Sequence, residues 1–144
     1  MIWTVRPTTE SLAAVHVGTA VEHLGIEFTG VGDDWLSARM PVDRRSLQPY
    51  GLLHGGASAL LAETLASCAG AHCVDPATHM CVGVELNANH LRPVRSGWVH
   101  AETRPLRVGR RIQVWEVDIR DEHGHRVCAS RLTLAVVSKD RPPA

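Results

Sequence analysis

The pattern of apolar and polar positions predicts two short strands, one long helix and then a second group of strands. Residues 26–42 contain two alternating runs around a glycine-rich turn, as a β-hairpin would. From residue 57 to about residue 73 the chain has no proline, and Leu61, Leu65 and Cys68 recur at the spacing of one helix face. The hairpin is therefore expected to lead, through an irregular segment, into a helix.

After this helix the period changes to two, which is typical of half-buried strands. Four such segments are separated by short turn sequences, and they predict four antiparallel strands in a meander. Near the N-terminus, residues 8–23 are expected to form short helical turns with Thr8 or Thr9 as N-cap. The predicted class is α+β, in one domain over residues 1–144 with a frayed tail at 138–144. The four strand segments are 80–94, 97–108, 111–122 and 125–137.

The long helix is rich in alanine, glycine and serine, so other backbone segments can approach it closely on several sides. An antiparallel sheet wrapped around one central helix would require such a surface. The chain of 144 residues is long enough to bury this core without disulfides or metals.

Charge and composition narrow the choice of partners. The chain has 15 Lys and Arg and 15 Asp and Glu residues, so its formal charge is zero, which argues against nucleic acid as a partner. No segment approaches the ~20 apolar residues of a membrane span, and the first residues lack the pattern of a signal peptide. The four cysteines form no CxxC pair. We therefore expect a cytoplasmic protein with reduced thiols and no membrane contact.

Residues 71–81 bring two histidines and two cysteines close together in sequence, which are residue types that bind zinc. His72 and Cys73 are adjacent, and His79 and Cys81 are separated by a single residue. Structural zinc usually needs two ligands two to four residues apart on each arm. The spacing favours ordinary loop and core residues, with no metal and no cofactor.

Polar groups that could perform chemistry gather around the start of the helix. His54, Gly55 and a second glycine precede the helical run, and free N–H groups at a helix N-terminus can polarise a carbonyl. Gln48 offers an amide just upstream. Glu63 and Ser67 follow on one helix face at i and i+4 spacing, with Glu63 partly desolvated in an apolar helix. Together these groups suggest hydrolysis of an acyl group, although a solvent-facing glutamate would also fit the helix position alone.

A second polar position lies at the end of the first strand after the helix. Counting by two, Val82, Val84 and Leu86 share one face, and Ala88 and His90 continue it if the strand has no bulge. His90 then points toward the core side. It is either a buried structural histidine or part of a pocket.

The spacing of His54 and Glu63 has a consequence for assembly. Nine helical residues separate them by roughly 13 Å along the helix axis. One reacting carbon cannot contact both groups unless they come from different chains. If these residues share a site, the protein is an obligate dimer with two identical sites related by a two-fold axis.

Four segments resemble the hotdog-fold thioesterases, in particular the branch of the proofreading thioesterase of enterobactin biosynthesis and related acyl-CoA thioesterases. They are "EHLGIEFTGVGDD", "MPVDRRSLQPYGLLHGGASALLAETLAS", "VGVELNANHLRPV" and "PLRVGRRIQVWEVDIRDEHG". The resemblance spans nearly the whole chain. It implies the hotdog fold, in which an antiparallel sheet wraps around one long central helix.

The resemblance also implies roles for the residues at the helix. The family's catalytic carboxylate, a general base or a nucleophile, matches Glu63, and its carbonyl-polarising amide matches Gly55. The supporting and hydroxyl-bearing positions of the family match His54, Gln48, Ser67 and His90. The substrate would be an acyl, in particular aroyl, thioester of coenzyme A or of an aryl carrier protein.

Relatives hold coenzyme A around one strand and one turn. The matching residues are Val82, Gly83, Arg92, Leu106, Arg107, Val108, Gly109, Arg110 and Arg111. Guanidinium groups suit nucleotide phosphates, which accounts for a local group of arginines that includes Arg104. Coenzyme A is then a substrate carrier and not a bound cofactor. The resemblance also implies sites shared by a homodimer, and two dimers commonly form a tetramer among relatives.

Two other functions are compatible with the same fold. A hotdog hydratase or dehydratase acting on acyl thioesters usually carries a catalytic histidine on the central helix, where this chain has Glu63. A non-catalytic acyl-CoA-binding protein would have no need of a carboxylate opposite a polarised carbonyl. Thioester hydrolysis is therefore the preferred prediction.

Overall fold

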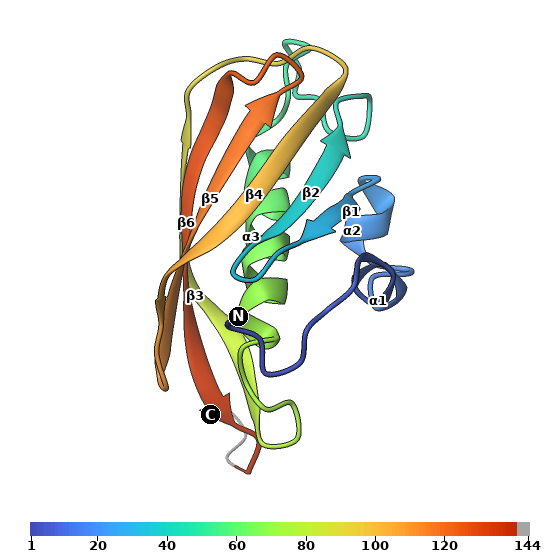
Figure 1. Ribbon diagram of the computed structural model, residues 1–144. Helices are drawn as coiled ribbons and strands as arrows, with labels where there is room; N and C mark the ends of the chain where they lie inside the picture. Colours follow the sequence, from blue (N-terminus) through green and yellow to red (C-terminus); the bar gives the residue numbers. More distant parts are fainter. Residues whose placement is uncertain (141–144) are drawn as a thin grey trace.

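A six-stranded antiparallel sheet curves around one long helix in the computed structural model, which describes residues 1–140 (Figure 1). Two short helices lie beside the first strand (Figure 1), and one residue of each, Leu12 and Val21, is buried in the core that the long helix shares with the sheet. In chain order the elements are α1 (Thr9–Ala14), α2 (Ala20–His23), β1 (Glu27–Val31), β2 (Leu36–Pro41), α3 (Gly55–Ala71), β3 (His79–His90), β4 (Trp98–Val108), β5 (Ile112–Asp121) and β6 (Arg126–Ser138). This arrangement confirms the α+β class and the hotdog architecture.

The strand order is β1-β2-β4-β5-β6-β3, so only β4, β5 and β6 form a meander. The prediction that all four later strands follow one another in a meander was wrong. β3 pairs with β6 along eleven register positions, from His79 opposite Ser138 to His90 opposite Cys128. Alternation identifies a strand, but the choice of neighbour depends on contacts between segments far apart in sequence. β3 consequently forms one edge of the sheet.

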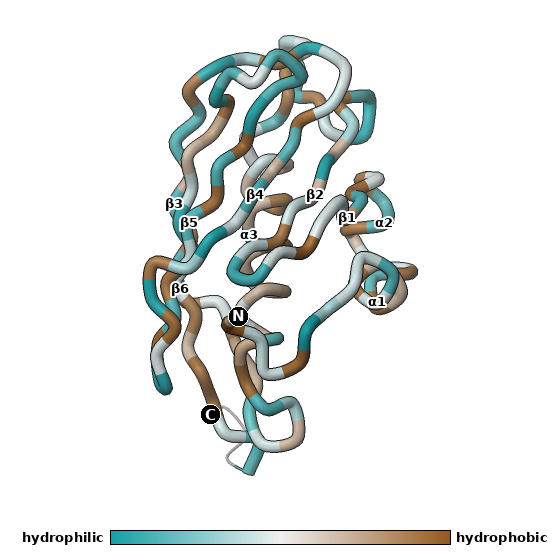
Figure 2. The backbone as a smooth tube through the Cα atoms, in the orientation of Figure 1, coloured by the Kyte–Doolittle hydropathy of each residue, from teal (hydrophilic) through white to brown (hydrophobic). Residues whose placement is uncertain are grey.

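Helix α3 fills the inner face of the sheet. Figure 2 shows the helix as mostly white to brown, while strand β5 alternates between teal and brown. The residues of α3 that face the sheet are buried, and Leu61, Leu65 and Ala66 are 0% exposed. They pack against Trp115 of β5 and Leu132 of β6, which are also fully buried. The helix begins two residues before the predicted start, because His54 caps it and both following glycines take helical geometry.

Strand β3 contains a bulge that changes which residues face the helix. Gly83 lies opposite Leu134 and Glu85 lies opposite the next residue of β6, so Val84 is the extra residue and is 62% exposed. A bulge shifts the alternation by one position. The predicted common face of Val82, Val84 and Leu86 was therefore wrong.

The two ends of the chain agree with the predictions in part. Thr8 caps α1 and accepts a hydrogen bond from Ser11 N–H, as expected. The C-terminal tail starts later than predicted, because Ser138 ends β6 and Lys139 N–H donates to Thr78 O at 2.9 Å. Residues 141–144 of the predicted tail lie outside the described residues. No helix within residues 1–140 is long and apolar enough to cross a bilayer.

Candidate active site at the start of the central helix

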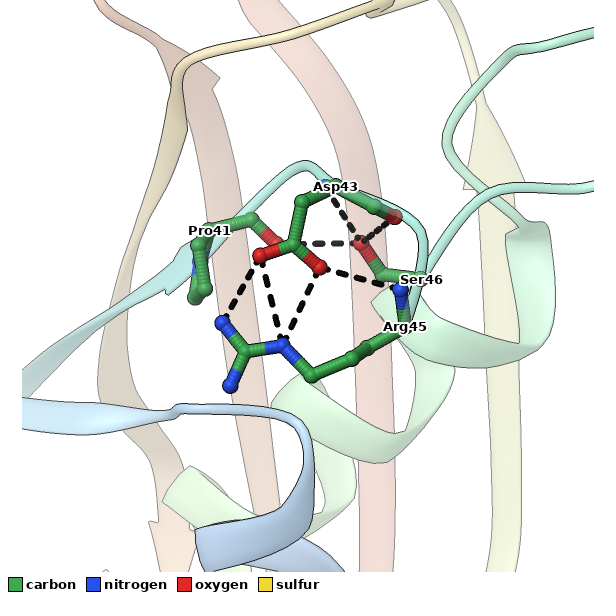
Figure 3. Close-up of polar contacts among 4 residues, drawn as sticks. All are labelled: Pro41, Asp43, Arg45 and Ser46. Carbon is green, nitrogen blue, oxygen red and sulfur yellow. Dashed lines mark hydrogen bonds and ion pairs between the residues drawn. The ribbon is translucent and has the colours of Figure 1, made fainter.

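A compact turn after β2 anchors the loop that leads into helix α3 (Figure 3). The Asp43 carboxylate receives hydrogen bonds from the Arg45 guanidinium, at 2.7 Å for Nη2, and from its backbone N–H. These bonds lower the pKa of Asp43 to about 2. Ser46 is buried, and its hydroxyl donates to Pro41 O at 3.0 Å. The carbonyl of Ser46 accepts from His54 N–H at 2.7 Å, so the turn holds the residue that starts the helix.

His54 is the N-cap of α3, and its side chain turns back onto the helix. Nδ1 accepts a hydrogen bond from Gly56 N–H at 2.8 Å, so the neutral ring carries its proton on Nε2. The N–H of Gly55 has no acceptor among residues 1–140. Because the first amides of a helix carry its positive dipole end, this free donor is suited to a carbonyl oxygen that gains negative charge.

A cleft of about 350 Å³ opens at this helix start. It brings together four predicted site residues, Gln48, Gly55, His90 and Arg92, with one that the sequence did not predict, Ser58. The Oε1 atom of Gln48 accepts from Tyr50 N–H, which leaves its amide nitrogen available to a ligand. The remaining lining residues are Leu52, Leu53, Leu91, Pro93 and Val127.

His90 and Gly55 approach each other closely across this cleft. A Cβ atom built on Gly55 would lie 2.7 Å from His90 Nε2, a distance that no real side chain tolerates. Glycine is therefore required here as long as the imidazole keeps this position. Of the two sequence interpretations of His90, the structure favours the pocket position. The bulge in β3 comes before His90, so the residue shares a face with Leu86 and Ala88.

Glu63 lies two turns further along α3, outside this cleft, and faces strand β3. It is half-buried, as predicted, and a Cβ built on Gly83 would lie 2.6 Å from Glu63 Oε1. The carboxylate therefore occupies the space that a side chain at position 83 would need. Ser67 follows one turn later on the helix and is also half-buried. The predicted catalytic residues thus form two groups within one chain. One group lies at the cleft at the helix start, and the other, Glu63 and Ser67, lies further along the helix.

The predicted coenzyme A residues are divided in the same way. Val82 and Ile112 both lie opposite Ala135 of β6, so the β4–β5 hairpin (106–111) and the Val82–Gly83 segment share one end of the sheet. Arg92 lies at the other end, where its N–H donates to Val127 O. The four arginines also separate: Arg104 pairs with Asp34 and Glu102 on the outer face of the sheet. Within residues 1–140, by contrast, Arg107, Arg110 and Arg111 form no ion pair.

A larger hollow of about 760 Å³ lies on the outer face of the sheet and contains none of the predicted site residues. Three of its four arginines already have carboxylate partners in the fold, and Arg104 pairs with Asp34 and Glu102. Arg120 and Arg126 both pair with Asp118 at 2.6 Å. Because these charges neutralise one another, this hollow is a poor candidate for the reaction despite its size.

The cysteines are not suited to nucleophilic chemistry. Burial raises the pKa of Cys68 and of Cys73 to about 12, and it also raises the pKa of Cys81 and Cys128. Neutral thiols are poor nucleophiles and poor metal ligands. Across residues 1–140, no three His, Cys, Asp or Glu side chains are grouped as metal ligands.

Ser58 is the site residue that sequence reasoning missed. It lines the cleft three residues after Gly55, and an i, i+3 pair shares one helix face. The same spacing rule that linked Glu63 to Ser67 could have identified it. Its small size and its place in a run of alanines concealed it.

Comparison with known proteins identifies the family. Residues 50–128 match the model of the "Thioesterase superfamily". This chain belongs to that family. It is a thioester hydrolase, which confirms the preferred prediction over the hydratase and acyl-CoA-binding alternatives.

The relatives and solved structures cover nearly the whole chain. The chain is 54% identical to "Proofreading thioesterase EntH" of Cronobacter turicensis, over 95% of this chain and 99% of the relative. It is 49% identical to "1,4-dihydroxy-2-naphthoyl-CoA hydrolase" of Escherichia coli, over 95% and 100% of the two chains. A crystal structure of a thioesterase from Haemophilus influenzae superposes with a TM-score of 0.92 at 51% identity, with 96% of each chain covered. These matches confirm the hotdog fold of this thioesterase.

Proposed function

We propose that this thioesterase hydrolyses aroyl or other acyl thioesters of coenzyme A, or of an aryl carrier protein, to the free acid and the thiol. The observation that carries the proposal is the free N–H of Gly55 in a cleft at the positive end of α3. Such a donor stabilises the oxyanion that forms when a thioester carbonyl is attacked. Two relatives at about half identity are named for a proofreading thioesterase and for an aroyl-CoA hydrolase.

In the proposed reaction the thioester carbonyl oxygen accepts the hydrogen bond from Gly55 N–H. The Glu63 carboxylate then either activates a water molecule or attacks the carbonyl carbon itself. Collapse of the tetrahedral intermediate breaks the carbon–sulfur bond, and the thiolate leaves and takes up a proton. In the second route water hydrolyses the acyl-glutamate anhydride, which restores the carboxylate. Ser67 and His90 support these groups from the helix and from β3.

The two groups of residues call for two chains in each site. Gly55 and Glu63 are separated by about 12 Å along the helix. Gly83 and His90 lie roughly 23 Å apart along β3. Because β3 is the sheet edge, two copies can pair these strands antiparallel about a two-fold axis. That pairing would bring the Gly83 end of one chain to the His90 end of its partner. We therefore propose a homodimer with shared sites, which can associate further into a tetramer.

The same arrangement supports a coenzyme A site. Arg92 stands at the cleft of one chain, and the Arg107, Arg110 and Arg111 side chains would approach it from the partner. These guanidinium groups form no ion pair within residues 1–140, so they can bind nucleotide phosphates, and the Val82–Gly83 segment of the edge strand would lie beside the pantetheine arm. Leu106 and Val108 are 52% and 42% exposed on the same hairpin, and can cover the apolar part of the ligand.

The test is a panel of benzoyl-, dihydroxybenzoyl-, dihydroxynaphthoyl-, phenylacetyl- and fatty acyl-CoA, ranked by kcat/KM. Glu63→Gln should lower kcat by about 10²-fold or more on every active substrate. Glu116→Gln is the matched control, because that exposed carboxylate lies on the outer face of the sheet. If Glu63→Gln stays within threefold of wild type, the assignment of Glu63 is wrong. A single turnover in ¹⁸O-labelled water separates the two routes: label in Glu63 supports the anhydride.

Shared sites are tested by complementation. Glu63→Gln and Gly55→Ala are each expected to be nearly inactive as homodimers. In a heterodimer one site carries both changes and the other carries neither, so random mixing should restore about one quarter of wild-type activity. The double variant in a single chain should restore none. If mixing restores no activity while heterodimers are shown to form, each site belongs to one chain.

A further inference from the structure

The hydroxyl of Ser58 has no partner within the fold. Ser58 is 1% exposed and lines the cleft, and its Oγ atom forms no hydrogen bond to another described residue. Within residues 1–140 no fully buried side-chain oxygen or nitrogen lacks a partner, so the small exposure that remains belongs to this hydroxyl at the cleft surface. The other two buried serines differ in this respect. Ser46 Oγ donates to Pro41 O at 3.0 Å, and Ser130 Oγ donates to Asn87 O at 2.8 Å. A hydroxyl that reaches the surface of a cleft without a partner in the fold can donate to a ligand in that cleft.

The helix does not need a serine at this position. The N-cap is His54, which already satisfies Gly56 N–H. Ser58 is the fourth residue of α3, where alanine is the better helix former, and Ala57 and Ala59 flank it. Neither capping nor helix propensity accounts for the hydroxyl.

The position of Ser58 directs its side chain to the site. Each Cα–Cβ bond in a helix tilts toward the N-terminus, so a side chain at the fourth position lies over the first turn. Ser58 lines the cleft together with Gly55 and His90. Two unused donors, Gly55 N–H and Ser58 O–H, therefore face one cavity of about 350 Å³ at the positive end of α3.

We propose that Ser58 is a further catalytic residue, which donates its hydroxyl hydrogen to the carbonyl oxygen of the bound thioester beside Gly55 N–H. This role rests on the proposed thioester hydrolysis. A carbonyl oxygen has two lone pairs, and the oxyanion of the tetrahedral intermediate is stabilised by two donors better than by one. The proton stays on Ser58 throughout. No described side chain accepts a hydrogen bond from this hydroxyl, so it lacks the base that a serine nucleophile requires.

The first test separates catalysis from folding by two readouts. Ser58→Ala should lower kcat by about 10- to 100-fold. The same change should leave the melting temperature equal or higher, because it removes no hydrogen bond of the fold and alanine is the better helix former. Ser130→Ala is the control: it should lower the melting temperature and leave kcat unchanged. If Ser58→Ala lowers the melting temperature and leaves kcat unchanged, the hydroxyl is structural and the proposal is wrong.

The second test asks which substrate atom the hydroxyl meets. Two inert analogues of benzoyl-CoA are compared by calorimetry: a ketone with CH₂ in place of sulfur, and a thioether with CH₂ in place of the carbonyl. Ser58→Ala should weaken binding of the ketone about 5- to 10-fold and leave the Kd of the thioether unchanged. Equal effects on both analogues, or no effect on either, would overturn the proposal.

These binding tests remain decisive whatever the activity assay shows. If wild-type protein hydrolyses no thioester of the panel, the proposed substrate class fails, yet the ketone–thioether difference still decides the role of Ser58. If wild type is active and Ser58→Ala binds both analogues as wild type does, only the Ser58 proposal fails.

Discussion

The polar groups at the two ends of helix α3 differ in whether they have hydrogen-bond partners within the fold. At the C-terminal end, the carbonyl of Gly70 accepts from Gln113 Nε2 at 3.3 Å and from the Cys81 thiol at 3.3 Å. Trp115 Nε1 donates to Gln113 Oε1 at 3.0 Å, and Gln113 is fully buried. At the N-terminal end, Gly55 N–H and the Ser58 hydroxyl have no described partner and face a cleft.

Both ends carry a glycine in close contact with the sheet, so glycine alone does not mark the active site. The difference lies in hydrogen bonding. A satisfied buried network holds the helix in place, whereas unsatisfied donors in an open cleft are available to a ligand. Changes at the C-terminal end should therefore affect stability, and changes at the N-terminal end should affect turnover.

The largest expected effect is on turnover, from Gly55→Ala. The new Cβ would displace the His90 ring, which is exposed and can move, and would crowd the carbonyl-binding amide. We expect kcat to fall by about 10²-fold, with little change in melting temperature. Steady-state kinetics on the best thioester of the panel, with calorimetric melting, checks this. A large loss of stability at unchanged kcat would show that the N-terminal end of α3 serves folding and not turnover.

Gly70→Ala is the matching change at the other end. Its Cβ would clash with Leu134 Cδ1 and would lie 2.8 Å from Gln113 Oε1, both within the core. Overpacking of this kind should destabilise the fold by about 3 kcal/mol, since neither neighbour can move freely. Urea unfolding measures the free energy of unfolding. The kcat per folded molecule should remain near wild type, and a selective loss of kcat would show that this end also serves the reaction.

Gln113→Leu tests the buried network itself. Leucine has a similar volume but leaves Trp115 Nε1 without its acceptor, so we expect a loss of about 2 kcal/mol. Gln113→Glu serves as a second variant that keeps an acceptor at this position. Urea unfolding of both, with kcat measured in parallel, gives the result. If Gln113→Leu is as stable as wild type, the network does not hold the helix end.

The smallest effect is expected at the turn that anchors the start of α3. The Arg45 hydrogen bonds hold the pKa of Asp43 at about 2, below the ordinary value of 3.8. A depressed carboxyl pKa adds stability that is complete above about pH 4 and is lost as the pH falls toward 2. Asp43→Asn should therefore lose less stability than wild type over this range, which unfolding curves at pH 2–5 will show. Parallel curves for the two proteins would contradict the pairing.

Much of the site could be predicted from sequence because its residues cluster in one segment. Gln48, Gly55 and His90 meet in the cleft as expected, and Glu63 is half-buried on the predicted helix. Ser58 was missed because a missing hydrogen bond is visible only when all neighbours are in place. The four arginines do not stay together in the fold, since Arg104 belongs to an ion-pair network that includes Asp34, 70 residues away in the chain. A role of the other three in binding coenzyme A stays a prediction.

The sequence by itself determined the central helix, the strands and the residue types at the helix start, because periodicity, glycine and proline act over a few neighbouring positions. Only the tertiary structure decided that β3 forms the sheet edge beside β6, that a bulge at Val84 redirects its face, and that Glu63 occupies the space above Gly83. These features depend on pairing between segments that are distant along the chain. The free donors at Gly55 and Ser58 belong to the same group, because only the packed fold shows which polar groups have no internal partner.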